Sequence, residues 1–426
     1  MKPKVLIATT SRWFTTVRLA MALKNAGCTV DALCPVRHPL TQTDVAPHIY
    51  VYNGLIPLRS FEDAILATAP DLIVPCDDIA ARHLHELHEK SRCEGSRGRA
   101  ICALVEHSLG APENLPIVYA RAAFMELAAA VGIRVPKTQV ITNRYELEEC
   151  VSQIGFPIVL KADGTSGGIG VRVVRGMETA FRTLELLQSP PRLARALKRA
   201  VIDRDYALLC PALLRRRTVV NAQAFVAGRE ATSAVACWKG AVLASLHFEV
   251  LSKANAAGHA TVLRLIENRE MSLATEAICR QLRLSGVHGF DFMVEAETGN
   301  AFLIEMNPRA TQVGHLTLGA GRDLPAALYA AMSGDPIQSS PKLTENQTIA
   351  LFPQEWIRDP QSSFLQTGYH DVPWEQPELV QACIHARAGQ HGYHSNGKNR
   401  DKVISRTTDF LLAAAKGVQK ISSDAA

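Results

Sequence analysis

Three oxygen-bearing side chains near residue 300 lie on two segments that favour β-strands. In GFDFMVEAETGNAFLIEMNPRAT the first apolar run carries Asp291 and the second carries Glu305 and Asn307, with the turn residues AETGN between them. Strands joined in this way run antiparallel, and alternation puts Glu305 and Asn307 on one face, where Asp291 can meet them. Two carboxylates and an amide oxygen suit Mg²⁺ completed by substrate phosphates. Because apolar residues surround Glu305, we expect a positive group beside it.

A second candidate is KADGTSGGIG (161–170), which has four glycines in ten residues directly after the apolar run FPIVL. It is not a phosphate loop of the GxxxxGK[ST] type, because Val171 and Arg172 stand where a lysine and a hydroxyl are needed. It is not a dinucleotide fingerprint, because the third glycine is absent and the following VRVVR favours a strand. The remaining interpretation is a hairpin whose glycine-rich tip can cover a ligand, with Lys161 at the end of the incoming strand.

The elements that must position these residues begin with alternating strands and helices. The runs KVLIATT, CTVDALCP and DLIVPCDD predict strands, whereas TTVRLAMALKNAG, FEDAILATAP and IAARHLHELHEK have helical periodicity. This alternation predicts a doubly wound parallel sheet, and hence an α/β fold, at the N-terminus. The segment LGAPENLP (109–116), rich in proline and glycine, is the predicted boundary to the next domain.

The composition is that of a globular protein of 426 residues. Hydrophobic residues make up 47% of the chain, which is enough for packed cores. A net charge of +5 with 6% aromatic residues does not indicate a nucleic-acid-binding protein. No stretch approaches the roughly 20 apolar residues of a membrane span, and the N-terminus lacks the features of a signal peptide, so we expect a cytoplasmic protein. The ten cysteines form no CxxC pair, which favours reduced, buried thiols.

Taken together and in order, these motifs resemble the ATP-grasp superfamily, from YARAAFMELAAAVGIRVPKT to EMNPR. Members of that superfamily activate a carboxylate as an acyl phosphate with ATP and couple it to a nucleophile, usually an amine. The resemblance implies that the glycine hairpin lies over the triphosphate. The backbone of Gly167, Gly168 and Gly170 would then contact the phosphates, and Lys161 would supply a positive charge.

Further nucleotide contacts follow from the resemblance one position at a time. Arg121 stands eleven residues before the glycine of VGIRVP, where the family usually has a phosphate-binding lysine and carbamoyl-phosphate synthetase has arginine. In NAQAFVAGREAT, Gln223 and the backbone at Phe225 would meet adenine, and Glu230 would bind the ribose hydroxyls. Lys253 is a candidate for a phosphate or substrate contact, against the alternative of a plain surface lysine.

The metal ligands and the catalytic arginine also have counterparts. Asp291, Glu305 and Asn307 match the family's metal ligands, which implies ATP with Mg²⁺, or Mn²⁺ in its place, as cofactors. Arg309 matches the arginine that steadies the acyl phosphate or the transferring phosphoryl group, and we expect it and Lys161 to be catalytic. Phosphoryl transfer needs positioning and charge neutralisation, which these groups would supply.

The resemblance divides the chain into three parts. It predicts a Rossmann-like domain over 1–112 and a two-lobed ATP-grasp domain of α+β type over 113–335. The small lobe with the glycine flap covers about 140–225 and the large lobe about 226–335. Residues 336–426 form an extension to which no motif assigns a role.

The implied activity is that of a ligase that joins a small-molecule carboxylate to an amine or thiol and forms ADP and phosphate. One alternative is a bicarbonate-activating carboxylase or carbamoyl-phosphate-type enzyme, which the lack of a second ATP-grasp half and of a biotin-carrier segment disfavours. Another is an ATP-binding protein without catalysis, which the complete metal set and Arg309 disfavour. We expect no nucleic-acid or membrane partner, and a homodimer is an assembly to test.

Four other features invite a function but have simpler interpretations. HLHELHE (83–89) has one residue where the zinc-protease pattern needs two, so we expect a solvated helix face. The basic residues between 192 and 217 are expected to form an exposed face, and the polar segment 386–402 a mobile loop. His315 is a candidate substrate contact by position, although a structural histidine is the simpler interpretation.

Overall fold

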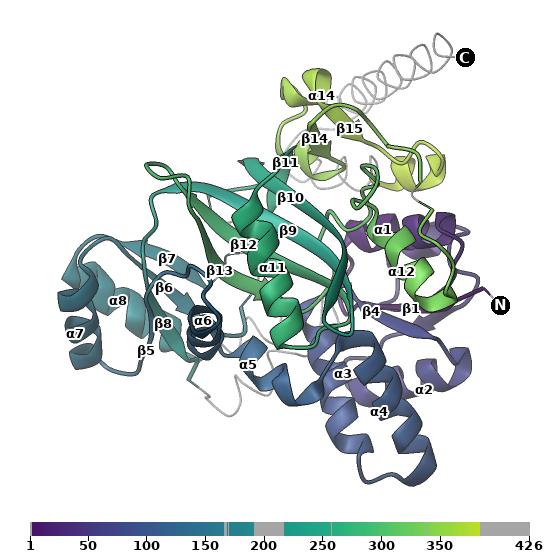
Figure 1. The fold of residues 1–426 in the computed structure, drawn as a ribbon, viewed down its shortest axis with the longest axis horizontal. Helices are drawn as coiled ribbons and strands as arrows, with labels where there is room; N and C mark the ends of the chain where they lie inside the picture. The colour runs from purple at the N-terminus through teal and green to yellow at the C-terminus, as the bar shows by residue number, and fades with distance from the viewer. Residues whose placement is uncertain are drawn as a thin grey trace, which may run out of the picture.

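Three β-sheets organise the part of the chain that the computed structural model describes (Figure 1). The described residues are 2–165, 168, 170–190, 217–256, 258–338 and 340–383. One sheet has four parallel strands, one has four antiparallel strands, and the largest has seven strands. The predicted fold class, α/β with an N-terminal doubly wound parallel sheet followed by a part of α+β type, is confirmed.

The N-terminal sheet has the strand order β3-β2-β1-β4, and all its pairs are parallel. Its strands are β1 (Lys4–Ala8), β2 (Thr29–Cys34), β3 (Ile49–Val51) and β4 (Leu72–Pro75). The helices are α1 (Phe14–Asn25), α2 (Pro57–Thr68), α3 (Asp78–Ser91) and α4 (Gly95–Leu109). Val5 and Ile7 pack into the core that holds α1, whereas Leu6 and Ala8 pack into the core of α2, α3 and α4. Alternate residues of β1 thus bury both faces of the sheet, as parallel strands require.

The small antiparallel sheet has the order β5-β8-β6-β7. Its strands are β5 (Thr138–Ile141), β6 (Ile158–Ala162), β7 (Val171–Val174) and β8 (Val220–Ala224). Helices α7 (Arg144–Ile154) and α8 (Met177–Gln188) cover one face, where Ile158 and Leu160 join their core. Period-2 alternation puts Lys161 on the opposite face. Strands β6 and β7 pair antiparallel around the glycine segment, which makes the predicted hairpin.

The seven-stranded sheet has the order β13-β12-β9-β10-β11-β14-β15. Its strands are β9 (Gly228–Trp238), β10 (Ala241–Lys253), β11 (Ala260–Leu265), β12 (Gly286–Glu295), β13 (Ala301–Asn307), β14 (Thr348–Leu351) and β15 (Tyr369–Asp371). The remaining α-helices of the described part are α5 (Leu115–Tyr119), α6 (Arg121–Ala130), α11 (Arg269–Gln281), α12 (Leu324–Ser333), α13 (Gln354–Arg358) and α14 (Phe364–Thr367). Strands β14 and β15 come from the C-terminal extension, so this extension completes the sheet.

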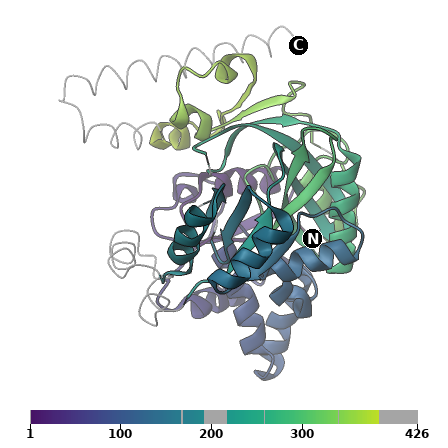
Figure 2. The ribbon, with the colours of Figure 1, turned by 90° about the vertical axis from the view of Figure 1, so that its left-hand side faces the viewer.

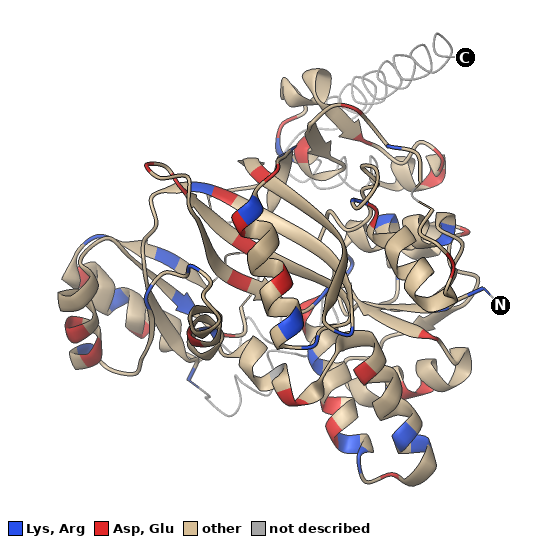
Figure 3. Ribbon diagram, in the orientation of Figure 1, with Lys and Arg blue, Asp and Glu red and all other residues tan. Residues whose placement is uncertain are grey.

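One hydrophobic core joins three parts of the chain. Its buried members include Val17 of α1, Leu246 of β10 and Ile349 of β14. Figure 2 shows the last described elements, in yellow-green, above the N-terminal domain. In the view of Figure 3, acidic and basic positions are interspersed along α11, α3 and α4. Within the described residues, no helix is both long enough and apolar enough to span a bilayer.

Candidate functional site

The hairpin of β12 and β13 brings the three predicted metal ligands together. Asp291 pairs directly with Glu305, and Gly289 pairs with Asn307. After Asp291 the register shifts, because Phe292 pairs with Leu303 and leaves Ile304 as an extra residue. The two carboxylate-bearing residues therefore occupy facing positions on adjacent strands.

Asp291 is held by neighbours on both sides. Its carboxylate accepts hydrogen bonds from Thr232 Oγ1 at 2.9 Å and from Asn307 Nδ2 at 3.0 Å. Burial raises the pKa of Asp291 to about 6, and the negative charge of Glu305 adds to the effect. A pair of carboxylates that repel each other in this way is stabilised by a bound cation, and its hard oxygen atoms suit a divalent one.

Two cationic side chains from other elements meet this hairpin. Arg121, the first residue of α6, donates from Nη2 to Glu305 Oε1 at 2.5 Å and is the positive group expected beside Glu305. Lys161 of β6 is only 4% exposed, and its Nζ donates to the carbonyl oxygen of Ile304 at 3.4 Å. Burial lowers the pKa of Lys161 to about 8, although Glu305 acts in the opposite direction. Helix α6 and the small sheet thus both contact β13 through a cationic side chain.

The two ends of the glycine segment lie in close contact around Thr165. Gly168 has φ +74°, which favours glycine, and a Cβ on Gly170 would lie 2.2 Å from Thr165 Oγ1. Thr165 Oγ1 donates to the carbonyl of Ala162 at 2.7 Å. Gly167 lies outside the described residues.

The residues predicted to hold adenine and ribose lie on consecutive strands. Gln223 of β8 is buried, and its Nε2 donates to Thr138 Oγ1 at 3.0 Å. Phe225 follows β8 and is 37% exposed. Glu230 of β9 lies 2.5 Å from Lys253 Nζ at the end of β10, and both side chains are partly exposed.

Arg309 links the metal hairpin to the N-terminal domain. Its Nη2 donates to Asn307 Oδ1 at 3.2 Å, and its Nε donates to Asp78 Oδ1 at 3.1 Å. Burial opposes its charge, but the charge and hydrogen bond of Asp78 outweigh burial, so the pKa of Arg309 is raised. Sequence reasoning did not select Asp77 or Asp78. Their position directly after a parallel strand was a usable signal, because ligands bind at that edge of such sheets.

His315 belongs to a buried charge network. Its Nε2 lies 2.6 Å from Asp371 Oδ2, and Arg18 Nη2 donates to Asp371 Oδ1 at 2.5 Å. Burial alone would raise the pKa of Asp371, but Arg18 and His315 overcome that effect and lower it to about 2. The network supports the structural interpretation of His315 and connects α1, β15 and the segment after β13.

The expectation of a solvated face for HLHELHE is wrong for part of the motif. His85 and His88 are buried because α4 and α5 cover that side of α3, and both have partners. Tyr119 Oη lies 2.9 Å from His85 Nδ1, and His88 Nε2 lies 3.0 Å from Glu106 Oε1. The basic residues 192–216 and the segment 386–402 lie outside the described residues.

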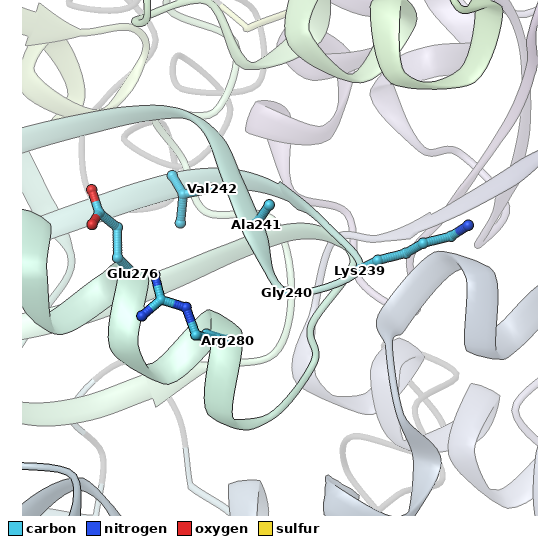
Figure 4. A pocket seen from close by; sticks show the side chains of 6 residues that line it. All are labelled: Lys239, Gly240, Ala241, Val242, Glu276 and Arg280. Atoms are coloured by element: carbon cyan, nitrogen blue, oxygen red, sulfur yellow. The ribbon is translucent and has the colours of Figure 1, made fainter.

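A surface pocket lies away from the predicted site, between the tip of the β9–β10 hairpin and α11 (Figure 4). It is lined by Lys239, Gly240, Ala241, Val242, Glu276 and Arg280. None of these residues is among those that the sequence selected, so the pocket adds nothing to the site around Asp291.

Comparisons with known proteins agree with this arrangement. Residues 120–321 match the family model described as the ATP binding domain of the carbamoyl-phosphate synthase L chain. The biotin carboxylase of Allochromatium vinosum is 25% identical over 200 residues, which cover 46% of this chain and 40% of that protein. The carbamoyl phosphate synthase large chain of Thermus thermophilus is 23% identical over 300 residues, covering 69% and 26%. The matched parts therefore span less than half the length of these curated relatives.

Solved structures show the same fold. A biotin carboxylase of Campylobacter jejuni in a β-γ-ATP complex has a TM-score of 0.55 at 14% identity and covers 82% of this chain and 74% of its own. The biotin carboxylase domain dimer of the 2-oxoglutarate carboxylase of Hydrogenobacter thermophilus, in complex with MgADP and bicarbonate, has a TM-score of 0.54 at 18% identity and covers 80% and 71%. The matched family model and these relatives are of the ATP-grasp type, and residues 120–321 of this chain are similar to their ATP-binding domain.

Proposed function

We propose that this protein is an ATP- and Mg²⁺-dependent ligase that activates a small-molecule carboxylate as an acyl phosphate and transfers the acyl group to an amine or a thiol. The observation that carries the proposal is the convergence of Asp291 and Glu305 with Arg121 and Lys161, next to Arg309. Two acidic residues face each other beside three cations that come from separate elements. Such a set suits a metal-bound polyphosphate.

The metal would be held by Asp291, Glu305 and Asn307. The raised pKa of Asp291 supports this assignment, because burial, with the charge of Glu305 adding to it, makes the ionised carboxylate unfavourable until a cation arrives. Mg²⁺ is the proposed ion, and Mn²⁺ accepts the same oxygen ligands. Once bound, the ion would neutralise part of the charge on the phosphates.

The nucleotide would lie between the small sheet and the large sheet. We assign Gln223 and Phe225 to adenine and Glu230 to the ribose, with Lys253 beside it. Arg121, Lys161 and the backbone of the glycine segment, including Gly167, Gly168 and Gly170, are assigned to the phosphates. Because Arg121 is paired with Glu305, nucleotide and metal binding would redirect both side chains: the guanidinium to phosphate and the carboxylate to the ion.

The reaction would proceed in two steps. A carboxylate oxygen of the substrate attacks the γ-phosphorus of ATP, and ADP leaves as the acyl phosphate forms. The nucleophile then attacks the carbonyl carbon, the C–O bond to phosphate breaks, and phosphate leaves while the nucleophile loses a proton. Lys161 and Arg309 would stabilise the negative charge that develops on the transferred group.

A second candidate is an enzyme that activates bicarbonate. It is favoured by the comparisons, since biotin carboxylase and carbamoyl phosphate synthase are among the matched relatives. In that case bicarbonate takes the place of the carboxylate and the same residues act. A homodimer is also proposed, because the Hydrogenobacter thermophilus biotin carboxylase domain is a dimer, and light scattering would test it.

The test is ATP turnover by the purified protein with Mg²⁺, scanned against pools of amino acids, hydroxy acids and bicarbonate, with ADP and phosphate as readouts. We expect one pool to stimulate turnover with ADP, not AMP, as product. Lys161→Ala and Glu305→Ala should each lower the rate by about a hundredfold or more, equivalent to about 3 kcal/mol of barrier. The matched controls are Lys239→Ala and Glu297→Ala, which lie away from the site. Near-normal turnover in either site variant would refute the assignment.

A further inference from the structure

The turn between β1 and α1 is at the place where doubly wound sheets most often bind phosphate. There the first turn is usually glycine-rich, and its backbone N–H groups and the helix N-terminus face the anion. In this chain the turn is TTSRW (9–13) and contains no glycine. Whether this turn could bind a phosphate therefore depends on where its hydrogen-bond donors point.

Four of these donors, one backbone N–H and three hydroxyls, point to a carboxylate of the protein itself. Asp77 follows β4, is 9% exposed, and accepts hydrogen bonds from Thr9 Oγ1 at 2.7 Å and from Thr10 N at 2.6 Å. It also accepts from Thr10 Oγ1 at 2.9 Å, Ser11 Oγ at 3.4 Å and Ala80 N at 2.8 Å. An internal anion thus occupies the group of donors that could otherwise surround a phosphate.

This turn adjoins the proposed catalytic site. Asp78, which follows Asp77 in the chain, binds Arg309, and Ala310 N donates to the carbonyl of Pro75 at 2.9 Å. On the other side, the rings of Trp13 and His259 lie 5.9 Å apart in an edge-on contact. The segment after β13 also contacts β11, because Gln312 Nε2 donates to the carbonyl of Ala260, the neighbour of His259, at 3.0 Å. Four segments therefore pack against one another beside Arg309.

Two polar atoms that this region leaves unused are hydrogen-bond acceptors, and a third, the buried hydroxyl of Thr311, can donate or accept. Gln312 Oε1 is buried and accepts no hydrogen bond from the described residues. Asp78 binds Arg309 through Oδ1, and its Oδ2 accepts no hydrogen bond from the described part of the chain. Acceptors beside two negative residues, Asp77 and Asp78, favour a ligand that donates N–H groups and disfavour a phosphate ester.

We infer that the nucleophile of the proposed reaction is an amine without a phosphate group, bound next to Arg309 with Asp78 and Gln312 accepting its N–H groups. The inference rests on the proposed function for the identity of the reaction, but the exclusion of phosphate rests on the contacts of Asp77 alone. It separates this chain from relatives of the same fold such as the N5-carboxyaminoimidazole ribonucleotide synthetase of Thermus thermophilus, whose name specifies a ribonucleotide.

The first experiment compares amines with their phosphorylated counterparts. ATP turnover is measured with the stimulating carboxylate pool plus serine or phosphoserine, and plus ethanolamine or phosphoethanolamine. We expect only the unphosphorylated member of a pair to raise ADP formation. A greater rate with the phosphorylated member overturns the inference.

The second experiment needs no turnover, so it remains decisive if the proposed function fails. Binding of inorganic phosphate is measured by calorimetry, with ADP and Mg²⁺ present throughout, for the unmodified protein, for Asp77→Ala and for the control Asp63→Ala on the exposed face of α2. Removing the Asp77 carboxylate leaves its hydrogen-bond donors without their acceptor and takes away a negative charge that would repel phosphate. Asp77→Ala should therefore bind phosphate on the order of tenfold more tightly or better. Equal affinity in the unmodified protein and Asp77→Ala overturns the inference.

Asp77 also caps α3, so folding of the variant has to be checked by thermal unfolding. Asp77→Asn removes the charge and keeps one acceptor oxygen, which can still accept from Ala80 N and cap α3, whereas an amide NH₂ replaces the oxygen that accepts from Thr9 Oγ1 and Thr10 N. If the alanine variant does not fold, the asparagine variant carries the test, with a smaller gain in phosphate affinity expected and an unchanged affinity as the contrary result.

Discussion

The pH dependence of nucleotide binding follows from the burial of Lys161. This side chain is 4% exposed, and burial lowers the pKa of its ammonium group to about 8. An ordinary lysine titrates near 10.4. The perturbation is a change of pH from 7 to 9, through which the free protein loses the charge that we assign to the phosphates.

The pKa of Lys161, about 8, sets how much ADP affinity is lost as the pH rises. If the phosphates bind only the protonated ammonium, ADP affinity falls by about twofold at pH 8 and about tenfold at pH 9, and each further unit costs about 1.4 kcal/mol. Folding stability changes in the opposite direction. Because the pKa of Lys161 is lower in the folded chain than in the unfolded chain, the unfolded chain binds more protons between pH 8 and 10.4, and stability rises with pH in that window by up to about 3 kcal/mol.

The assay is calorimetric titration with ADP and Mg²⁺ at pH 7, 8 and 9 and constant ionic strength. Repeating it in buffers of different ionisation enthalpy reports proton uptake on binding. Lys161→Met, which has a similar length and no charge, should bind more weakly with no dependence on pH in this range. An affinity of the unmodified protein that stays constant from pH 7 to 9 would refute the reasoning.

Three other predictions concern separate parts of the structure. Since the pKa of Asp291 is raised to about 6, Mg²⁺-dependent ADP binding should weaken as the pH falls from 7 to 5, and Asp291→Asn should remove that dependence. Asp371→Asn should destabilise the fold by about 3 kcal/mol, because it removes the buried counter-charge of Arg18 and leaves only the exposed Glu375 at 3.4 Å, and the thermal midpoint should fall on the order of 5 °C. Because the pKa of Asp371 is lowered to about 2, its contribution is present above about pH 4 and is lost as the pH falls toward 2. Gly170→Ala should weaken ATP binding in the same titration, because a Cβ there meets Thr165, whereas Gly176→Ala, with open space, should not.

Local patterns in the sequence were sufficient for the hairpin that holds Asp291 and Glu305. Their facing positions follow from strand alternation and a short turn, which are properties of adjacent residues. The need for a positive group beside Glu305 was also predictable from its apolar neighbours, but its identity was not. Arg121 reaches it from a helix that is distant in sequence, and tertiary packing decides that contact.

Long-range contacts account for what sequence reasoning missed. Asp78 and Arg309 are separated by 231 positions, and they meet only because the parallel sheet packs against the end of β13. His85 and His88 were expected in solvent, since a helix with several polar residues looks exposed until its neighbours are known. Here α4 lies against α3 and covers them.

The way the C-terminal extension completes the large sheet has a consequence for dissecting this protein. A fragment that ends at residue 335 would remove β14 and leave β11 with unpaired backbone groups along one edge, a template for association between copies. It would also leave Arg18 without Asp371 in any fragment that keeps α1. Sequence motifs therefore delimit the proposed site residues but not an autonomous folding unit, and fragments cut at the motif boundary should aggregate where the longer chain remains monodisperse.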